Sequence, residues 1–301
     1  MARYSAVTKD HATGVGEWIP DLIIPQVVQT AMENECFMPL TRRFDLTGAG
    51  AVFSIPQAGA LAWATLTNDG TDPDETIFDC AVRTLTPVPH FLDVVIPFSV
   101  DDATAVDLQT EVAKEAAVGL ADYRDTLLAA LYSDRPTSTP DHYYGTDATE
   151  LNFSTLRACQ NLLYVQKAPK PFAWVVHPTQ FTELLKDDTF INAGVKGSPV
   201  LTQGIKGNGY ATSVIDVNVY VAEQIVESSG LHSMMFSENA ALAYGYKLIG
   251  KPGANKQEIM MDVEWDSSRR TIEINMTIHA VAGGAKGVAA AENTWLVNII
   301  S

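Results

Sequence analysis

Residues 101–133 read DDATAVDLQTEVAKEAAVGLADYRDTLLAALYS, and the rest of the chain is interpreted around this stretch. It contains no proline and one glycine, Gly119, so little in it interrupts a helix. An apolar stripe runs along it, formed by Val106, Ala113, Leu120 and Leu127 at seven-residue intervals and widened by Ala116, Ala117, Tyr123, Leu128 and Leu131. The pattern predicts an amphipathic helix from about Asp101 to Ser133, roughly 45–50 Å long.

Both ends of this stretch carry helix-terminating signals. Ser99, Asp101 and Asp102 offer side-chain oxygens to the free amides of a first turn, and Pro136 cannot continue the hydrogen-bond ladder. The side opposite the apolar stripe is acidic, with only Lys114 and Arg124 set against Asp107, Glu111, Glu115, Asp122 and Asp125. We expect these acids to be exposed and to add little to fold stability, since an isolated surface ion pair contributes at most about 1 kcal/mol.

The composition excludes several classes of protein. The chain has 301 residues, 47% of them apolar, which is enough for one elaborated domain or two smaller ones. Its net charge of −16 and its lack of a Lys/Arg cluster argue against sequence-specific binding of duplex DNA. Cys36, Cys80 and Cys159 form no CxxC pair, which suggests a reducing compartment. With no apolar run as long as a membrane span and no evident secretion signal, we expect no membrane partner.

A long irregular loop precedes the helix. Residues 51–56 and 82–100 read as strands, and residues 57–81 between them show little regular pattern, so the two strands can pair as a hairpin with a protruding loop. The loop is acidic, but its acids lack the order of ligands and glycine of an EF-hand; they are Asp69, Asp72, Asp74, Glu75 and Asp79. We therefore interpret it as a solvated loop rather than a calcium site.

The second half of the chain mixes helices and strands. The predicted elements are a helix at 154–166, a buried strand at 172–176, a helix opened by His177-Pro178 with Phe181, Leu184 and Leu185 facing inward, and strand-like segments at 211–222, 232–236 and 295–300. Residues 257–279 alternate apolar and polar side chains on both sides of a short polar turn. This period of two predicts an antiparallel hairpin with one buried face.

No motif predicts catalysis, a cofactor or a metal, so no catalytic, cofactor-binding or metal-binding residue is expected, and the chain is not expected to be an enzyme. The six histidines are dispersed without metal-ligand spacing: His11, His90, His142, His177, His232 and His279. Gly245–Lys251 begins like a phosphate-binding loop, but Pro252 replaces the Ser or Thr that holds magnesium. His177 beside Pro178 is interpreted as a helix-start residue rather than a base. Three glycines lack dinucleotide-binding spacing, namely Gly204, Gly207 and Gly209.

The order of these parts resembles the major capsid proteins of tailed bacteriophages, which have the HK97-like shell fold, and the resemblance covers nearly the whole chain. It is carried by Trp18-Ile19-Pro20, Gly50-Ala-Val-Phe-Ser-Ile-Pro56, Val94-Val-Ile-Pro-Phe-Ser99 leading into Asp101-Asp102, Val175-Val-His-Pro178 followed by Leu184-Leu185, and Gly204 to Gly209 followed by Ala211 to Val221.

The resemblance implies an α+β chain with four parts. They are an N-terminal arm at 1–45, an extended β-hairpin loop with flanking strands at 46–97, a peripheral domain with the long spine helix and an antiparallel sheet at 98–150 and 250–301, and an α/β axial domain at 151–249. It implies pentamers and hexamers that close into an icosahedral shell around double-stranded DNA, in a virion assembled in the host cytoplasm. Its further partners would be separate scaffolding and portal proteins, with a decoration protein as an optional addition.

Two features depart from some members of that family, and two alternatives stay open. Residues 57–93 contain no lysine, so the covalent cross-link that some relatives form from a loop lysine is not expected. The chain starts directly at the arm, so we expect a separate scaffolding protein or prior cleavage. The acidic helix face is expected to aid solubility and repel packaged DNA. The alternatives are an encapsulin-like shell around a cargo enzyme and an acidic cytosolic hydrolase without a recognised motif.

Overall fold

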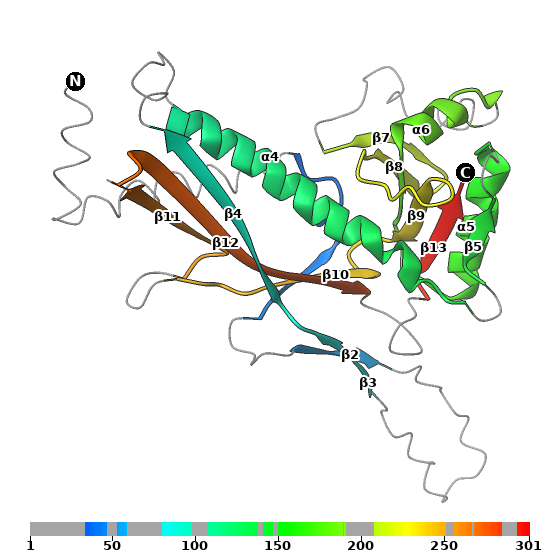
Figure 1. The fold of residues 1–301 in the computed structure, drawn as a ribbon. Coiled ribbons are helices and arrows are strands. Elements are labelled where there is room, and N and C mark those ends of the chain that lie inside the picture. Colours follow the sequence, from blue (N-terminus) through cyan, green and yellow to red (C-terminus); the bar gives the residue numbers. More distant parts are fainter. Residues whose placement is uncertain are drawn as a thin grey trace, which may run out of the picture.

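The computed structural model of the chain describes residues 34–46, 53–58, 80–97, 108–137, 141–146, 150–188, 190, 208–250, 256–266, 268–284 and 294–301. The fold is mixed α and β, with two main sheets and a long helix that runs from one sheet towards the other (Figure 1). Most of the predicted arm, the loop at 59–79 and the predicted helix start at Asp101 lie outside the described residues.

The described elements follow one another along the chain. The helical elements are η2 (Met38–Leu40), α4 (Leu108–Ala129), η3 (Ala130–Asp134), α5 (Phe153–Val165) and α6 (Pro178–Leu184). The strands are β1 (Arg42–Asp45), β2 (Phe53–Ala58), β3 (Cys80–Leu85), β4 (Val88–Pro97), β5 (Tyr143–Gly145), β6 (Phe172–Val176), β7 (Tyr210–Val214), β8 (Val217–Val221), β9 (His232–Ser237), β10 (Leu242–Tyr246), β11 (Ile259–Asp266), β12 (Thr271–Gly284) and β13 (Leu296–Ile300).

The first sheet is built on β12, the longest strand. β11 pairs antiparallel with β12 from Thr271 to Ile278 and β4 from Thr271 to Ala280, β10 pairs with its last residues, and β1 adds in parallel to β10. The predicted hairpin at 257–279 is confirmed, with Asp266 opposite Thr271 beside the turn. Its buried side chains alternate along β12, at Ile272, Ile274, Met276 and Ile278, as the period of two requires.

The long helix α4 covers one face of this sheet (Figure 1). Ala116, Ala117 and Leu128 of the predicted stripe are buried, and Leu120, Tyr123 and Leu127 pack against the same core at partial exposure. The helix tightens into the 3₁₀ turn η3 before Arg135-Pro136, close to the end that the proline predicts. The stripe therefore faces the sheet, as predicted.

The second sheet has six strands in the order β5-β13-β9-β6-β8-β7. All five residues of β6 are buried because side chains on its two faces enter different cores. Phe172, Trp174 and Val176 pack with α5 and α6, whereas Ala173 and Val175 belong to the core that also contains α4 and the first sheet. One hydrophobic core thus spans both sheets and holds them together.

Two predictions about the second half need correction. Residues 211–222 form two antiparallel strands, β7 and β8, because the chain reverses at Ile215-Asp216, where both residues have positive φ. Leu185 is more than a third exposed instead of facing inward, because it lies after the last turn of α6. Strand β13, at the end of the chain, pairs with β9 and β5 of the second sheet.

The strand that leads to the helix is also shorter than predicted. Residues 82–100 were expected to form one strand, but β3 ends at Leu85 and β4 begins at Val88, because Pro87 has no amide hydrogen for a ladder. β2 and β3 pair antiparallel from Phe53↔Leu85 to Ala58↔Cys80, so the predicted hairpin is confirmed. It lies apart from both main sheets (Figure 1).

Candidate assembly surfaces

A buried ionic cluster joins three distant segments beside α4. The guanidinium of Arg124 forms ion pairs with Glu35, which precedes β1, and with Glu258, which precedes β11. The side chains of Arg124 and Glu35 are 1% and 0% exposed. Arg43 of β1 also reaches Glu35 at 3.5 Å, and the Tyr244 ring of β10 lies 5.7 Å from the guanidinium carbon of Arg124. The cluster anchors the chain at the end of the predicted arm onto the helix.

Asp125 corrects the interpretation of the acidic face. It is 2% exposed, and its two carboxylate oxygens accept hydrogen bonds from the backbone amides of Cys36 at 2.7 Å and Phe37 at 3.0 Å. Burial, together with the nearby charges of Glu35 and Asp122, outweighs these two amide donors and raises the pKa of Asp125 to about 7. Asp125 is therefore a buried side chain that holds the segment before η2 by hydrogen bonds, not a surface acid.

The helix pattern itself contained a signal for this cluster. Arg124 lies four residues after Leu120 and four before Leu128, so it falls within the apolar stripe and not opposite to it. A charged residue at such a position requires a buried partner. Glu35 and Glu258 are 89 and 134 residues away from it in sequence, so no local pattern could name them.

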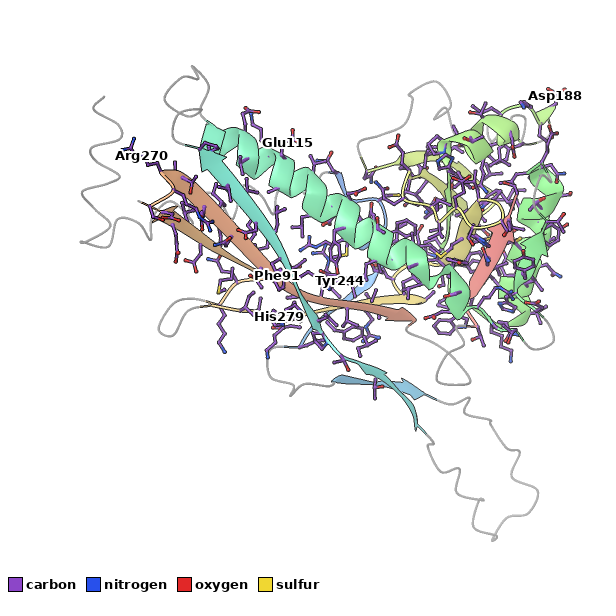
Figure 2. The ribbon with its side chains drawn as sticks, in the orientation of Figure 1. Phe91, Glu115, Asp188, Tyr244, Arg270 and His279 are labelled. Atoms are coloured by element: carbon purple, nitrogen blue, oxygen red, sulfur yellow. The ribbon has the colours of Figure 1, made fainter. Side chains whose placement is uncertain are left out.

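The other acids of this face meet the prediction where they are described. Glu111 and Glu115 are exposed, and Glu111 forms a surface ion pair with Lys114 at 2.8 Å. Glu115 lies on the side of α4 turned away from the sheet (Figure 2). Asp122 is also exposed and accepts a hydrogen bond from Gln224 at 2.7 Å. Asp107 lies outside the described residues.

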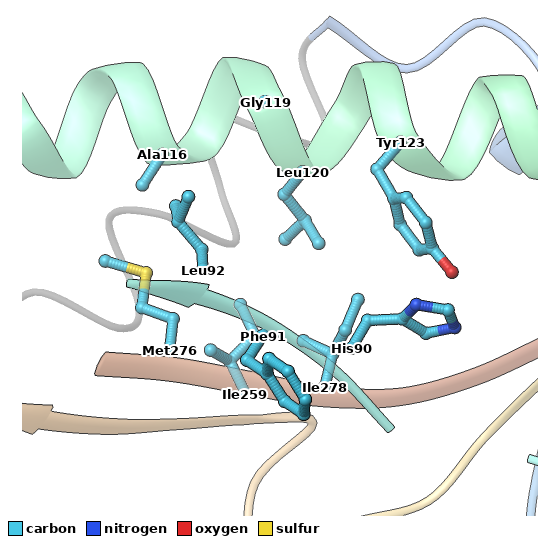
Figure 3. Close-up of a pocket in the computed structure, with 10 residues that line it drawn as sticks. All are labelled: His90, Phe91, Leu92, Ala116, Gly119, Leu120, Tyr123, Ile259, Met276 and Ile278. Carbon is cyan, nitrogen blue, oxygen red and sulfur yellow. The ribbon is translucent and has the colours of Figure 1, made fainter. Parts of the chain in front are cut away.

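Strand β4 exposes an unusual amount of apolar surface. Four of the nine large apolar residues that are exposed within the described part of the chain belong to it, namely Val88, Phe91, Leu92 and Val95. Phe91 is 79% exposed and lies on the opposite face of the strand from Leu92 (Figure 3). Within the described residues, β12 is the only strand that pairs with β4, and no other strand among them pairs with the second edge of β4. An apolar strand edge that is left unpaired is a pairing surface for another chain.

A mostly apolar pocket of about 220 Å³ lies between β4 and α4 (Figure 3). It is lined by His90, Phe91, Leu92, Ala116, Gly119, Leu120, Tyr123, Ile259, Met276 and Ile278. His90 and Tyr123 stand together at one end, with ring centroids 4.8 Å apart. A Cβ added to Gly119 would meet no atom within 4 Å, so the helix is not closely packed at this point.

The β2–β3 hairpin is anchored to the body at its base. Leu85 is buried with Ala243 of β10, and Phe44 and Val281 pack against this pair. Beyond this anchor the hairpin extends away from both sheets (Figure 1). An isolated two-stranded hairpin is at best marginally stable in water, so a projecting one is suited to packing on another molecule.

His177, Gly245 and Gly209, which the sequence analysis considered as possible catalytic or phosphate-binding positions, have structural roles. The ring of His177 accepts a hydrogen bond from the Thr179 amide and caps α6, so its interpretation as a helix-start residue is confirmed. Gly245 lies within β10, where a Cβ would come within 2.7 Å of Leu46, so it is part of a strand and not of a phosphate-binding loop. Gly209 has φ +75°, a backbone geometry that favours glycine.

The described histidines do not converge on one site. His90 lines the pocket, His142 contacts the Leu296 carbonyl, and His232 contacts the Ser228 carbonyl. Within the described ranges, no three His, Cys, Asp or Glu side chains are grouped so that they could hold a metal ion. Among the same residues, no helix is both long and apolar enough to cross a membrane.

The first prediction concerns the pH dependence of Asp125. An unfolded Asp has a pKa near 3.9, so at about pH 5 the folded chain keeps a proton that the unfolded chain has lost, and this stabilisation disappears as the pH rises through about 7. We expect the free energy of unfolding of the wild type, relative to that of Asp125→Asn, to fall by up to about 1.4 kcal/mol per pH unit in this window. Urea denaturation at several pH values measures it.

Glu115→Gln is the matched control for this experiment, because Glu115 is an exposed acid on the same helix and its charge is not among those that raise the pKa of Asp125. It should leave the pH profile of the wild type nearly unchanged. A difference between the wild type and Asp125→Asn that stays constant across the window would contradict the raised pKa.

The second prediction concerns the loosely packed part of α4. Gly119→Ala should raise the free energy of unfolding by about 0.5–1 kcal/mol, because glycine costs about that much inside a helix and the added methyl group meets no neighbour. Gly245→Ala is the matched control and should destabilise the chain, because its methyl group would collide with the buried Leu46. Denaturant melts of both variants test the packing; a loss of stability in Gly119→Ala would be the contrary result.

Solved structures with a similar architecture come from protein shells. The chain is similar to a protein in the capsid of Ralstonia phage GP4, with a TM-score of 0.67 and 12% identity over 86% of each chain. A chain of the cyanophage Pam1 capsid asymmetric unit matches with a TM-score of 0.65 and 14% identity, over 88% of this chain and 91% of that one. A chain of the holo-SrpI encapsulin complex of Synechococcus elongatus PCC 7942 matches with a TM-score of 0.60 and 9% identity, over 87% of this chain and 85% of that one.

Sequence comparison alone does not detect this likeness: no protein-family model and no curated protein sequence matches the chain. The structural likeness extends over most of both chains in every case, so it concerns the whole architecture and not one motif. The chain therefore has the fold of these capsid and encapsulin subunits, and the resemblance to HK97-like shell proteins that its sequence predicts is confirmed at the level of the fold.

Proposed function

We propose that this chain is the major capsid protein of a tailed bacteriophage, and that it assembles through pentamers and hexamers into an icosahedral shell around double-stranded DNA. The observation that carries the proposal is the match of the whole architecture to capsid subunits, over 86% of both chains for Ralstonia phage GP4. It is located in the virion after assembly in the host cytoplasm. Scaffolding and portal proteins are its further partners, and a decoration protein is an optional one.

The surface of the subunit supports an assembling role. The β2–β3 hairpin projects from the body, and β4, which pairs with β12 alone among the described strands, presents four exposed apolar side chains. A monomeric soluble protein rarely exposes such a set together. The net charge of −16 suits a container for DNA, because an acidic wall does not bind the phosphate backbone.

The proposed division of the chain follows the shell fold. The arm is residues 1–45 and the extended loop with its flanking strands is 46–97. The peripheral domain, 98–150 and 250–301, contains α4 and the strands β11 and β12 of the first sheet, and the axial domain, 151–249, contains four of the six strands of the second. The other strands cross these limits, since β13 and β5 lie in the second sheet and β4, β10 and β1 in the first.

The encapsulin-like alternative rests on one specific observation, the similarity to the holo-SrpI encapsulin complex. Both functions predict shells, so the contents of purified particles separate them. Nuclease-resistant DNA inside the particles supports the capsid, whereas a co-purifying cargo protein in place of DNA supports the encapsulin. The described residues provide no observation in favour of the hydrolase alternative.

The third prediction tests assembly through the hairpin. Ala58 and Cys80 are cross-strand partners, so residues 59–79 can be replaced by a two-residue Asn-Gly turn that closes the hairpin. We expect the shortened chain to keep the melting temperature of the isolated subunit but to form no closed shells, because the replaced loop would pack on a neighbour. Electron microscopy beside thermal melting measures both. Normal shells from the shortened chain would disprove this role of the loop.

The fourth prediction concerns covalent linkage. Because residues 57–93 contain no lysine, shells should separate fully into monomers in hot detergent. A denaturing gel of purified shells measures this, with unassembled subunits as the control. A ladder of covalent multimers would contradict it.

A further inference from the structure

The turn between β7 and β8 has the wrong residue for its geometry. Val214 pairs with Val217, which leaves Ile215 and Asp216 as a two-residue turn with φ values of +47° and +64°. Asn-Gly is the usual choice for such a turn, and a β-branched residue at positive φ costs on the order of 1–3 kcal/mol. Ile215 is also 45% exposed, so it gains little from burial. Folding of the subunit does not explain this residue.

The strained turn is held firmly in place. The side-chain amide of Gln160, itself buried, donates a hydrogen bond to the Ile215 carbonyl at 2.7 Å and another to the Tyr164 hydroxyl at 3.0 Å. Lys170 forms an ion pair with Asp216 at 2.7 Å and lies 5.0 Å from the centre of the Tyr164 ring. A group fixed in one conformation loses little entropy when it is bound, so the turn is pre-organised for contact.

Two side chains are connected to this turn, Tyr164 through Gln160 and Lys170 through Asp216. Val165 and Lys167 follow Tyr164 in the sequence, and we call the surface made of Tyr164, Val165, Lys167, Lys170 and Ile215 the α5 corner. Tyr164 is 38% and Val165 61% exposed. The whole chain has a net charge of −16, but at this corner Lys167 and Lys170 stand against Asp216 alone, which pairs with Lys170. The corner therefore has a small positive charge, opposite to that of the whole chain.

A complementary surface lies on α4 of the same chain. Glu111, Glu115, Val118 and Asp122 fall on one line of the helix, at spacings of four, three and four residues. We call this line the α4 stripe. Val118 is 49% exposed between the acids, so the stripe has an apolar centre. Lys114 pairs with Glu111, so Glu115 and Asp122 make the rim acidic, opposite in charge to Lys167 of the α5 corner.

We propose that the α5 corner of one subunit docks on the α4 stripe of a second copy, with Ile215 against Val118 and Lys167 near Glu115 or Asp122. In one chain, α5 and the first turns of α4 lie at opposite ends of the molecule, so the contact is made between copies (Figure 1). Two different surfaces meet, and such a contact closes into a ring when the rotation allows it. The inference rests on the proposed shell function and assigns the acidic stripe to a neighbour instead of to repulsion of DNA.

The first arm of the test separates folding from docking. Ile215→Asn should leave the melting temperature of the subunit unchanged or higher, because asparagine tolerates positive φ. The same variant should weaken capsomer formation by about tenfold or more, since the apolar contact is lost. Ile215→Leu keeps an apolar side chain and should assemble nearly as the wild type does. Sedimentation velocity over a range of subunit concentrations measures the association.

The second arm tests the charges. Lys167→Glu should weaken association about three- to tenfold, and adding Glu115→Lys in the same chain should restore it, because every copy carries both surfaces. Lys186→Glu is the matched control and should have no effect on association. Lys186 is an exposed lysine near the other end of α5, because the neighbouring Asp187 accepts a hydrogen bond from the Phe153 amide.

Each outcome decides between the proposals. Shells from the wild type with undiminished association of Ile215→Asn and Lys167→Glu would overturn the docking inference and leave the shell function standing. Normal association of Lys167→Glu with loss of packaged DNA would also overturn it, because the corner would then bind DNA. A wild type that never assembles would overturn the shell function itself, and the docking inference with it.

Discussion

The pairing of Arg124 with Glu35 and Glu258 is the interaction on which the arrangement of the subunit depends. Removing two charges from water costs several kcal/mol per ion, and a buried pair recovers this only when the geometry is good and further hydrogen bonds are made. Here one guanidinium meets two carboxylates, and the adjacent Asp125 accepts two backbone amides. These contacts join the segment before β1, the helix and the entry to β11. Losing one partner would leave an uncompensated buried charge.

The apolar core complements this polar anchor. The same cluster of buried side chains includes Phe37 and Met38 beside η2, Leu128 of α4, Phe236 of β9 and Ile274 of β12. The two sheets are therefore faces of one packed body, joined through α4, and not two globules on a linker. In the shell that we propose, a body of this kind would transmit load between neighbours, and the hairpin and β4 would provide surfaces on which neighbours meet.

The sequence predicted those elements whose signal is local. The alternation at 257–279 and the apolar run at 172–176 each place a strand, because burial of one or both faces leaves its own period in the chain. The pairing of β13 with β9 was missed, since strand order depends on contacts some sixty residues apart. Asp125 was assigned to the wrong environment for the same reason: its partners are backbone amides of Cys36 and Phe37, and backbone amides carry no sequence signal.

The surfaces were harder to predict than the fold, and the identity values explain why. Chains only 9–14% identical to this one have the same architecture, so the fold requires a pattern of apolar positions and not particular residues. What is particular to this chain then lies where it departs from the pattern. Arg124 interrupts an apolar stripe because it holds the cluster together. Ile215 occupies a turn in which asparagine or glycine would fold more easily, and a residue that the fold does not need there is best explained by a contact outside the subunit.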